Sequence, residues 1–276
     1  MPQDFPANPI ARPGYALEFH DDFTTGTLDP GKWIAAHLPQ WSSTERAAAR
    51  WHIEDQQLVL RIDADQPAWC PEYDGDIRVS SLQTGVYSGP LGSAVGQHRF
   101  NRHSVVREAQ APRALYTPTY GYFETRAKGV GVPGYHVALW MIGYEDRPER
   151  SSEICICEIF GKHAGAATAK VGMGVHPFQD PDIADDFEEV ALPIDVTHFH
   201  VYAAEWTPTH IDFFVDNLHV RRVHQSPGYP MQFMLGIYER PAERRAGAPG
   251  DGEFPKRFVV DYVRGYRREA APDSLA

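Results

Sequence analysis

Two carboxylates, Glu153 and Glu158, lie five residues apart in a short run of isoleucines and cysteines. β-Branched residues favour a strand, and on a regular strand residues five apart point to opposite faces. A bulge that adds one residue, at Ile156 or Cys157, would shift this alternation and put both glutamates and Cys155 on one face. Two carboxyl groups about 5 to 5.5 Å apart suit double-displacement hydrolysis of a glycosidic bond. The alternative is a half-solvated sheet face without a catalytic function.

The chain as a whole is acidic and of a size that suits one domain. It has 276 residues, a formal net charge of -11 and 12% aromatic residues. We expect an N-terminal tail over 1–14, one domain over 15–268 and a C-terminal tail over 269–276. The negative charge argues against nonspecific binding to nucleic acid or to an anionic membrane, because both need a cationic surface. A neutral partner fits better.

The cysteines and the start of the chain bear on redox chemistry and location. Cys70, Cys155 and Cys157 cannot all pair, and the last two are too close on one strand to bridge, so we expect no disulfide. Ligand pairs at zinc-site spacing are absent, so we expect no metal centre. The chain shows neither a membrane-length apolar run nor the charged-then-apolar start of a secretory signal. Either the protein is cytoplasmic or a leader has been removed.

Strand-like runs recur along the chain and are separated by Gly, Pro, Asn or Asp. Helical periodicity is scarce, and 44–50 is the one stretch that could form more than a turn. The spacing predicts an all-β sandwich or jelly roll. The predicted strands cover 16–20, 51–62, 80–88, 120–127, 136–142, 153–160, 169–176, 198–206, 210–215, 218–223, 231–238 and 257–266.

The segment 97–118 is a basic island in this acidic protein. Its cationic residues, set against Glu108 alone, are His98, Arg99, Arg102, His103, Arg107 and Arg113. One interpretation is a solvated surface loop. The other is a loop at the edge of a cleft that meets a polar or anionic ligand, because long loops in compact domains often bind ligands.

Five segments, in the same order, resemble glycoside hydrolase family 16, the laminarinase, lichenase, agarase and carrageenase group. The family's bulged Glu-x-Asp-x-x-Glu signature is matched at 153–158, with Cys155 where Asp is usual. The other matches are Tyr-Gly-Tyr-Phe-Glu-Thr-Arg at 120–126, Ala-Leu-Trp-Met at 138–141, Glu-Trp-Thr-Pro at 205–208 and Val-Asp-Tyr-Val-Arg-Gly-Tyr at 260–266. The resemblance extends from about residue 15 to residue 268.

The resemblance implies a concanavalin-like β-jelly-roll sandwich of two curved antiparallel sheets, with a polysaccharide cleft across the concave face. It implies that Glu153 is the nucleophile and that Glu158 is the acid and base. Burial and the charge of Glu153 would help Glu158 to keep its proton. Cys155 would contact the nucleophile as a weak donor, so we expect an active but slower or differently tuned enzyme.

The family's pattern also indicates residues that would bind the glycan. The candidates are Tyr135, His136, Trp140, His176, Arg50, Glu205 and Trp206. Some positions depart from the family: His136 stands in place of a Trp, and Arg50 and Gly236 each in place of an Asn. Together with the basic island, these departures leave room for a decorated or acidic polysaccharide.

The function that the resemblance implies is an endo-acting retaining β-glycan hydrolase of β-glucanase type, acting on a polysaccharide or oligosaccharide. It requires no cofactor and allows a structural calcium ion with Asp261 as a candidate ligand. It further implies a secreted protein, and we expect a monomer. Two alternatives stay open: a noncatalytic carbohydrate-binding jelly roll, and a transglycosylase that uses the same covalent intermediate.

Overall fold

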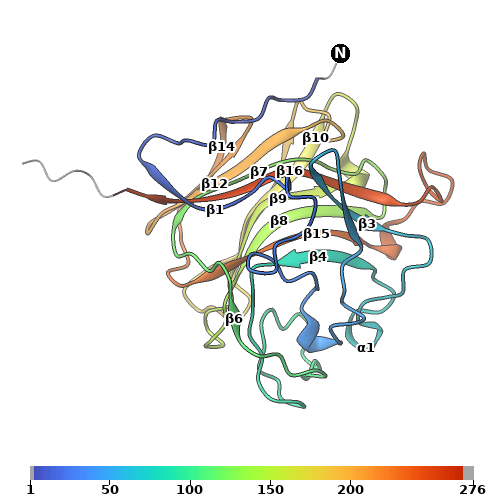
Figure 1. The fold of residues 1–276 in the computed structure, drawn as a ribbon, viewed down its shortest axis with the longest axis vertical. Helices are drawn as coiled ribbons and strands as arrows, with labels where there is room; N and C mark the ends of the chain where they lie inside the picture. Colours follow the sequence, from blue (N-terminus) through green and yellow to red (C-terminus); the bar gives the residue numbers. More distant parts are fainter. Residues whose placement is uncertain (1–2, 270–276) are drawn as a thin grey trace, which may run out of the picture.

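The computed structural model describes residues 3–269, which form two antiparallel sheets stacked face to face (Figure 1). The order of the larger sheet is β14-β13-β12-β7-β16-β3-β2, with β1 also paired to β16, and that of the smaller sheet is β11-β10-β9-β8-β15-β4. This architecture confirms the predicted jelly-roll sandwich.

The strands of the larger sheet are β1 (Tyr15–Asp21), β2 (Trp51–Glu54), β3 (Gln57–Ile62), β7 (Gly121–Lys128), β12 (His200–Trp206), β13 (Ile211–Val215), β14 (Leu218–Val223) and β16 (Lys256–Arg268). Those of the smaller sheet are β4 (Val79–Gln83), β8 (Tyr135–Gly143), β9 (Glu153–Phe160), β10 (Ala169–His176), β11 (Asp186–Leu192) and β15 (Met231–Glu239). The remaining elements are a small ribbon of β5 (Gly85–Val86) and β6 (Arg113–Ala114), the short helix α1 (Pro71–Asp74), and the 3₁₀ turns η1 (Pro39–Trp41), η2 (Gly161–His163) and η3 (Pro241–Glu243).

The main core lies between the sheets. Alternate residues of each strand point into it, as in Phe123 of β7 and Leu139 of β8, which are both fully buried. The predicted strands are present, with several differences. The run 51–62 is divided by a turn into β2 and β3, and the two-residue strand β6 was not predicted. Strand β11 was not predicted, because this edge strand is largely polar and half exposed. The segment 44–50 forms turns and a bridge rather than a helix.

The start of the described chain is not the loose tail that the sequence predicts. Residues 3–14 form neither helix nor strand, but they are bound to the outer face of the larger sheet. Asn8 donates through Nδ2 to Glu124 Oε2 at 2.9 Å, and Arg264 donates to the Asn8 carbonyl at 2.9 Å. The residues 270–276 of the predicted C-terminal tail lie outside the described residues.

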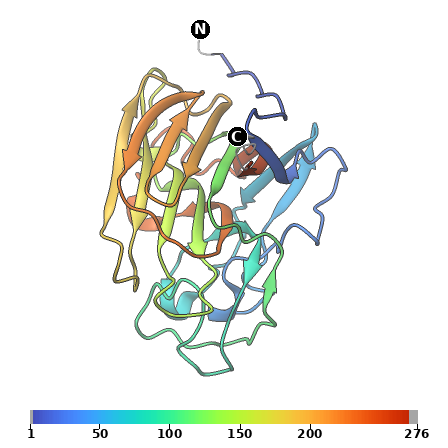
Figure 2. The ribbon, with the colours of Figure 1, turned by 90° about the vertical axis from the view of Figure 1, so that its left-hand side faces the viewer.

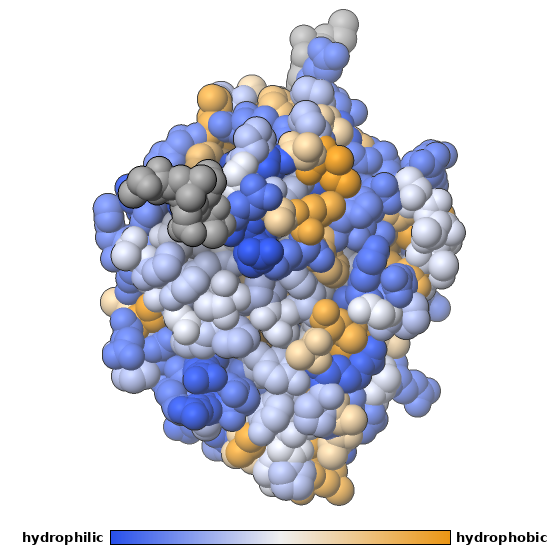
Figure 3. Space-filling model, turned by 60° about the vertical axis from the view of Figure 1, so that its left-hand side comes forward, coloured by the Kyte–Doolittle hydropathy of each residue, from blue (hydrophilic) through white to orange (hydrophobic). Residues whose placement is uncertain are grey.

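Two of the long connections between the sheets, which contain α1 and the segment 88–110, lie at one end of the molecule. Figures 1 and 2 both place α1 and the segment 88–110 at this end, below the sheets. On the part of the surface visible in Figure 3, hydrophobic residues lie in small groups between hydrophilic ones. Among the described residues, helices long and apolar enough to cross a membrane are not found.

Candidate active site

Strand β9 carries the predicted bulge. Its register against β8 pairs Cys155 with Trp140 and Cys157 with Leu139, which leaves Ile156 as the extra residue. Ile156 and Cys157 therefore both point into the core between the sheets. Because the bulge adds one residue, the alternation of side chains after Ile156 is shifted by one position. Glu158 therefore faces the same side of the sheet as Glu153.

Glu153, Cys155 and Glu158 consequently share the concave face of the smaller sheet. One carboxylate oxygen of each glutamate and the Cys155 Sγ atom all lie within 4.8 Å of one another. Cys155 is fully buried and Glu153 is 5% exposed. The Cys155 thiol donates a hydrogen bond to Glu153 Oε1 at 3.0 Å. Carboxylate oxygens of the two glutamates within 4.8 Å of each other are compatible with the closely spaced carboxyl pair that double displacement uses.

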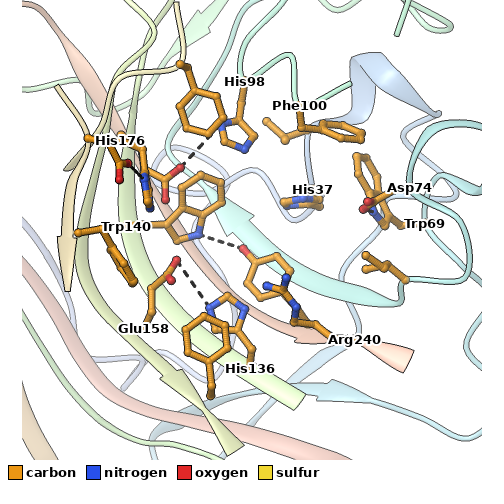
Figure 4. A pocket seen from close by; sticks show the side chains of 18 of the residues that line it. His37, Trp69, Asp74, His98, Phe100, His136, Trp140, Glu158, His176 and Arg240 are labelled. Carbon is orange, nitrogen blue, oxygen red and sulfur yellow. Dashed lines mark hydrogen bonds and ion pairs between the residues drawn. The ribbon is translucent and has the colours of Figure 1, made fainter. Parts of the chain in front are cut away.

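The two glutamates open into a cavity of ≈ 770 Å³. Trp140, His136 and His176, three of the predicted glycan-binding residues, line it (Figure 4). The Trp140 ring is fixed by a hydrogen bond from Nε1 to the Tyr238 hydroxyl at 3.0 Å. A cavity of this size with aromatic walls and a few polar groups is typical of a small-molecule or sugar site.

Burial and mutual repulsion make the glutamates a coupled pair that holds one proton. Burial and the nearby charge of Glu158 raise the pKa of Glu153 to about 8. Burial by itself would raise the pKa of Glu158, but the nearby rings of His136 and His176 and the guanidinium of Arg240 hold the pKa of Glu158 below its ordinary value. The opposite directions of these pKa shifts favour the shared proton on Glu153, whereas the resemblance implies a protonated Glu158.

Two histidines face this pair. The Nδ1 atom of His98 is 4.0 Å from Glu153 Oε2, and the Nε2 atom of His136 is 3.7 Å from Glu158 Oε1. Both nitrogens are buried without a hydrogen-bond partner within residues 3–269. Burial, together with repulsion by His176, lowers the pKa of His98 to about 4, so the His98 ring is neutral near pH 7.

His98 is the functional residue that the sequence reasoning did not assign to the site. Its backbone has a φ of 50°, which is strained for a residue with a side chain. The conformation is held by Glu145, whose Oε1 accepts a hydrogen bond from the His98 backbone N–H at 2.6 Å. The basic island did point to a loop at the cleft edge, and His98 is the part of that prediction that the structure places in the cavity.

Four predicted glycan-binding residues lie elsewhere. Tyr135 points into the core and its hydroxyl contacts Glu239 at 3.2 Å, because its position on β8 has the opposite parity to His136. Trp206 is 1% exposed and belongs to the same core.

The other two lie on the surface away from the cavity. Glu205 is on the larger sheet, where it accepts a hydrogen bond from the Tyr15 hydroxyl at 2.5 Å. Arg50 pairs with Asp63 at 3.0 Å, so its charge is used in a surface ion pair.

The arginines of the basic island are also occupied outside the cavity. Arg107 pairs with Glu72 at 3.0 Å, and Arg99 and Arg113 donate to backbone carbonyls. The described residues that line the cavity include one arginine, Arg240. The cavity thus provides little support for binding an acidic polysaccharide.

The calcium ion of the sequence analysis stays a prediction. Asp261, its candidate ligand, is paired with Arg126 at 2.9 Å rather than with a ring of oxygen ligands of the kind that calcium takes. Within the described part of the chain, Glu153, Cys155 and Glu158 are the one group of acidic, His or Cys side chains close enough to hold a metal ion, and it includes a sulfur.

Comparison with known proteins identifies the family. The profile of glycosyl hydrolases family 16 matches residues 112–264, more than half of the chain. The chain therefore belongs to glycosyl hydrolases family 16.

A solved structure with a similar fold is that of the GlcNAcα1-4Gal releasing endo-β-galactosidase from Clostridium perfringens. It is 32% identical, with a TM-score of 0.83, over 96% of this chain and 66% of that one. The laminarinase catalytic domain from Thermotoga maritima has a TM-score of 0.59 at 17% identity, over 93% of this chain and 99% of that one, and shares the jelly-roll fold.

The curated relatives share less sequence identity with this chain than the endo-β-galactosidase does. The endo-1,3-1,4-β-glycanase ExsH of Rhizobium meliloti is 22% identical over 91% of this chain and 52% of its own length. The β-glucanase of Rhodothermus marinus is 27% identical over 54% of this chain and 58% of its own length. The chain spans about half the length of these curated relatives.

Proposed function

We propose that this chain is a retaining glycoside hydrolase that cuts internal β-glycosidic bonds of a polysaccharide or oligosaccharide. The observation that carries the proposal is the bulge at Ile156, which brings Glu153 and Glu158 to one face at the floor of the ≈ 770 Å³ cavity. Membership of glycosyl hydrolases family 16 and the names of the relatives support the same activity.

The geometry supports a two-step reaction. In the first step a Glu153 oxygen attacks the anomeric carbon, and Glu158 gives its proton to the glycosidic oxygen as the bond to the leaving sugar breaks. A glycosyl ester on Glu153 results. In the second step Glu158 takes a proton from water, the hydroxide attacks the same carbon, and Glu153 leaves as a carboxylate. Two inversions give net retention.

The shared proton must change carboxyl before the first step. In the free enzyme the pKa shifts favour its position on Glu153, and attack requires Glu153 to be ionised and Glu158 to be protonated. The oxygens of the two groups are close enough for one proton to serve both. A glycosidic oxygen beside Glu158 accepts a hydrogen bond only from a protonated carboxyl, so substrate binding favours the productive arrangement. The Cys155 thiol stabilises the ionised Glu153 by its hydrogen bond.

Two substrate classes follow from the relatives. The names of the more distant sequence relatives give an endo-1,3-1,4-β-glycanase and a β-glucanase. A β-galactosidic linkage is the second candidate, because the endo-β-galactosidase combines the higher identity and the higher structural similarity to this chain. The acidic lining of the cavity favours a neutral glycan in either case.

A test combines a substrate panel with chemical rescue. Reducing-end release is measured on β-glucans, β-galactans and sulfated galactans, with Glu153→Gln as the inactive control. With an activated aryl glycoside, azide should rescue Glu153→Ala to an α-glycosyl azide and Glu158→Ala to a β-glycosyl azide. The opposite pairing would exchange the two roles.

The same assays separate the alternatives. A noncatalytic carbohydrate-binding jelly roll would bind a glycan without turnover and without labelling of Glu153 by a fluoro-sugar. A transglycosylase would label Glu153 but give longer oligosaccharides when an acceptor sugar is added. Hydrolysis that is unchanged by added acceptor supports the proposed hydrolase.

A further inference from the structure

One end of the cavity forms a distinct chamber. We call it the blind chamber and define it by His37, Trp69, Asp74 and Phe100. Figure 4 shows these four residues on one side of Trp140, with His176 on the other. His37 is 6% exposed and Trp69 is 1% exposed, so they form the deep wall of the cavity rather than its rim.

Contacts between two segments close this end. The loop that carries Phe100 is held to the segment around α1: the Phe100 and Trp69 rings lie 5.6 Å apart, and Asn101 Nδ2 donates to the Tyr73 carbonyl at 2.9 Å. The Arg107–Glu72 ion pair at 3.0 Å joins the same two segments. These contacts lie across this end of the cavity and narrow it.

The opposite end of the cavity is open. It is lined by Phe178, which is 44% exposed, and by Asp185, whose side chain is 66% exposed. The two ends of the site therefore differ in exposure: His37 and Trp69 at one end are buried, whereas Phe178 and Asp185 at the other end are exposed.

The walls of the blind chamber suit a neutral sugar. The His37 Nδ1 atom is buried without a hydrogen-bond partner within the described residues, and burial lowers the pKa of His37 to about 3, so a neutral ring faces the cavity. Such a group is costly to leave unpaired and pairs well with a sugar hydroxyl. Trp69 donates through Nε1 to Asp74 Oδ2 at 2.7 Å, which fixes its ring and leaves the second Asp74 oxygen for another hydroxyl. The carboxylate disfavours an anionic sugar.

We propose that the blind chamber binds the non-reducing terminal sugar of a neutral β-linked glycan, so that the enzyme cuts at a fixed distance from that end. The inference rests on the proposed function and specifies its substrate. In a double displacement the non-reducing fragment stays bonded to Glu153 while the other fragment leaves. A closed chamber suits the fragment that is retained, and the open end suits the one that departs.

The experiment measures product length. Linear β-galacto- and β-gluco-oligosaccharides of graded length are supplied with a free non-reducing end and with that end blocked by a 4,6-O-benzylidene group. The expected result is one short product from every length at early times, with cleavage of the blocked series reduced about tenfold or more, as for loss of a buried contact. Mixed product lengths at the earliest times, or equal cleavage of both series, would overturn the inference.

Variants locate the effect. Phe100→Ala and His37→Gln are expected to broaden the product lengths and to cleave the blocked series better relative to the free series. Leu218→Ala is the control, since it removes a side chain that is 71% exposed on β14 of the larger sheet, outside the cavity, and should leave the product length unchanged. Circular dichroism and Tm establish that each variant is folded. If His37→Gln does not fold, Asp74→Asn, which keeps the size of the side chain, replaces it in the experiment.

A binding measurement separates failure of this inference from failure of the proposed function. If no glycan is cleaved, the proposed hydrolase is wrong. Calorimetry with the same free-ended oligosaccharides then tests the chamber: weakening of about tenfold in His37→Gln but not in Leu218→Ala supports the proposal. Binding that neither variant alters, or no binding of any oligosaccharide, rejects it.

Discussion

The Cys155 thiol donates a hydrogen bond to the Glu153 carboxylate at 3.0 Å, at the position where the family signature has an aspartate. Burial and the two neighbouring glutamates raise the pKa of Cys155 well above its ordinary value, so the thiol stays protonated. The residue is therefore a permanent donor and never a third negative charge. This leaves the proton balance of the site to Glu153 and Glu158 alone.

Removal of the thiol should slow the reaction and shift its pH dependence. In Cys155→Ala the ionised Glu153 loses a donor, so its pKa should rise and kcat should fall about tenfold. Cys155→Ser keeps a donor and should stay closer to wild type. The measurement is kcat from pH 4 to 10 for all three proteins. An alanine variant with unchanged kcat and pH profile would show that the hydrogen bond does not affect Glu153.

The pH dependence of kcat/KM should be bell-shaped. The productive pair holds one proton, which is lost as the pH rises through about 8, the raised pKa of Glu153. A second proton is gained only at low pH, since the pKa of Glu158 is below its ordinary value. Activity should therefore be high from about pH 5 to 7 and fall above about 8.

A variant tests that assignment. Glu158→Gln removes the charge that raises the pKa of Glu153. With an activated aryl glycoside the variant needs no general acid, because the leaving group departs without being protonated. Its activity should rise with pH to a plateau, without the alkaline decrease. An alkaline limb that remains in Glu158→Gln would have to come from another group.

Gly236 leaves space for the Tyr238 ring that supports Trp140. A Cβ atom at Gly236 would lie 2.7 Å from the Tyr238 hydroxyl, so Gly236→Ala should displace the ring, break the 3.0 Å hydrogen bond to Trp140 and lower kcat/KM about tenfold. Tyr238→Phe removes the hydroxyl. The double variant should be no worse than Tyr238→Phe alone, which a double-mutant cycle measures. Additive losses would contradict a shared mechanism.

Glu145 should make stability depend on pH. Burial raises its pKa in the folded protein from 4.5 to about 8. A raised pKa contributes stability that is fully present below the pKa of the unfolded chain and is lost as the pH rises through about 8. Glu145→Gln keeps an acceptor for His98 and removes this loss. Its Tm should exceed that of wild type by about 3 °C or more at pH 8.5.

The control for this comparison is the same pair of proteins at pH 4.5, where Glu145 is protonated and the two Tm values should be closer. A Tm difference that is the same at both pH values would mean that ionisation of Glu145 is not the cause.

Local spacing was enough to predict most of the strands and the bulge, because alternation along a strand is a property of adjacent residues, but it missed the polar edge strand β11. The same rule would have excluded Tyr135, since Trp140 faces the cavity and residues 136 and 138 share its parity. It would not have placed His98. That ring reaches Glu153 through a strained loop conformation and a buried glutamate distant in sequence, and neither has a local signal.

Arg50 and Glu205 illustrate the other limit of sequence reasoning. Each stands on a predicted strand or beside one, but the pairing of strands decides whether a position faces the cleft. Glu205 lies on the larger sheet and Arg50 meets Asp63, and both facts depend on contacts between distant segments. The family pattern therefore gave the residue type at these positions but not the neighbours that decide whether the side chain faces the cleft.

The first and the last strand in chain order lie side by side, since Tyr15 of β1 pairs with Arg268 of β16 in the larger sheet. Glu153 and Glu158 lie on β9 of the smaller sheet and face the cavity. A linker or a solid support attached beyond either of these strands would thus leave the entrance of the cavity unobstructed. An immobilised form of the protein would still reach an insoluble or cell-bound glycan.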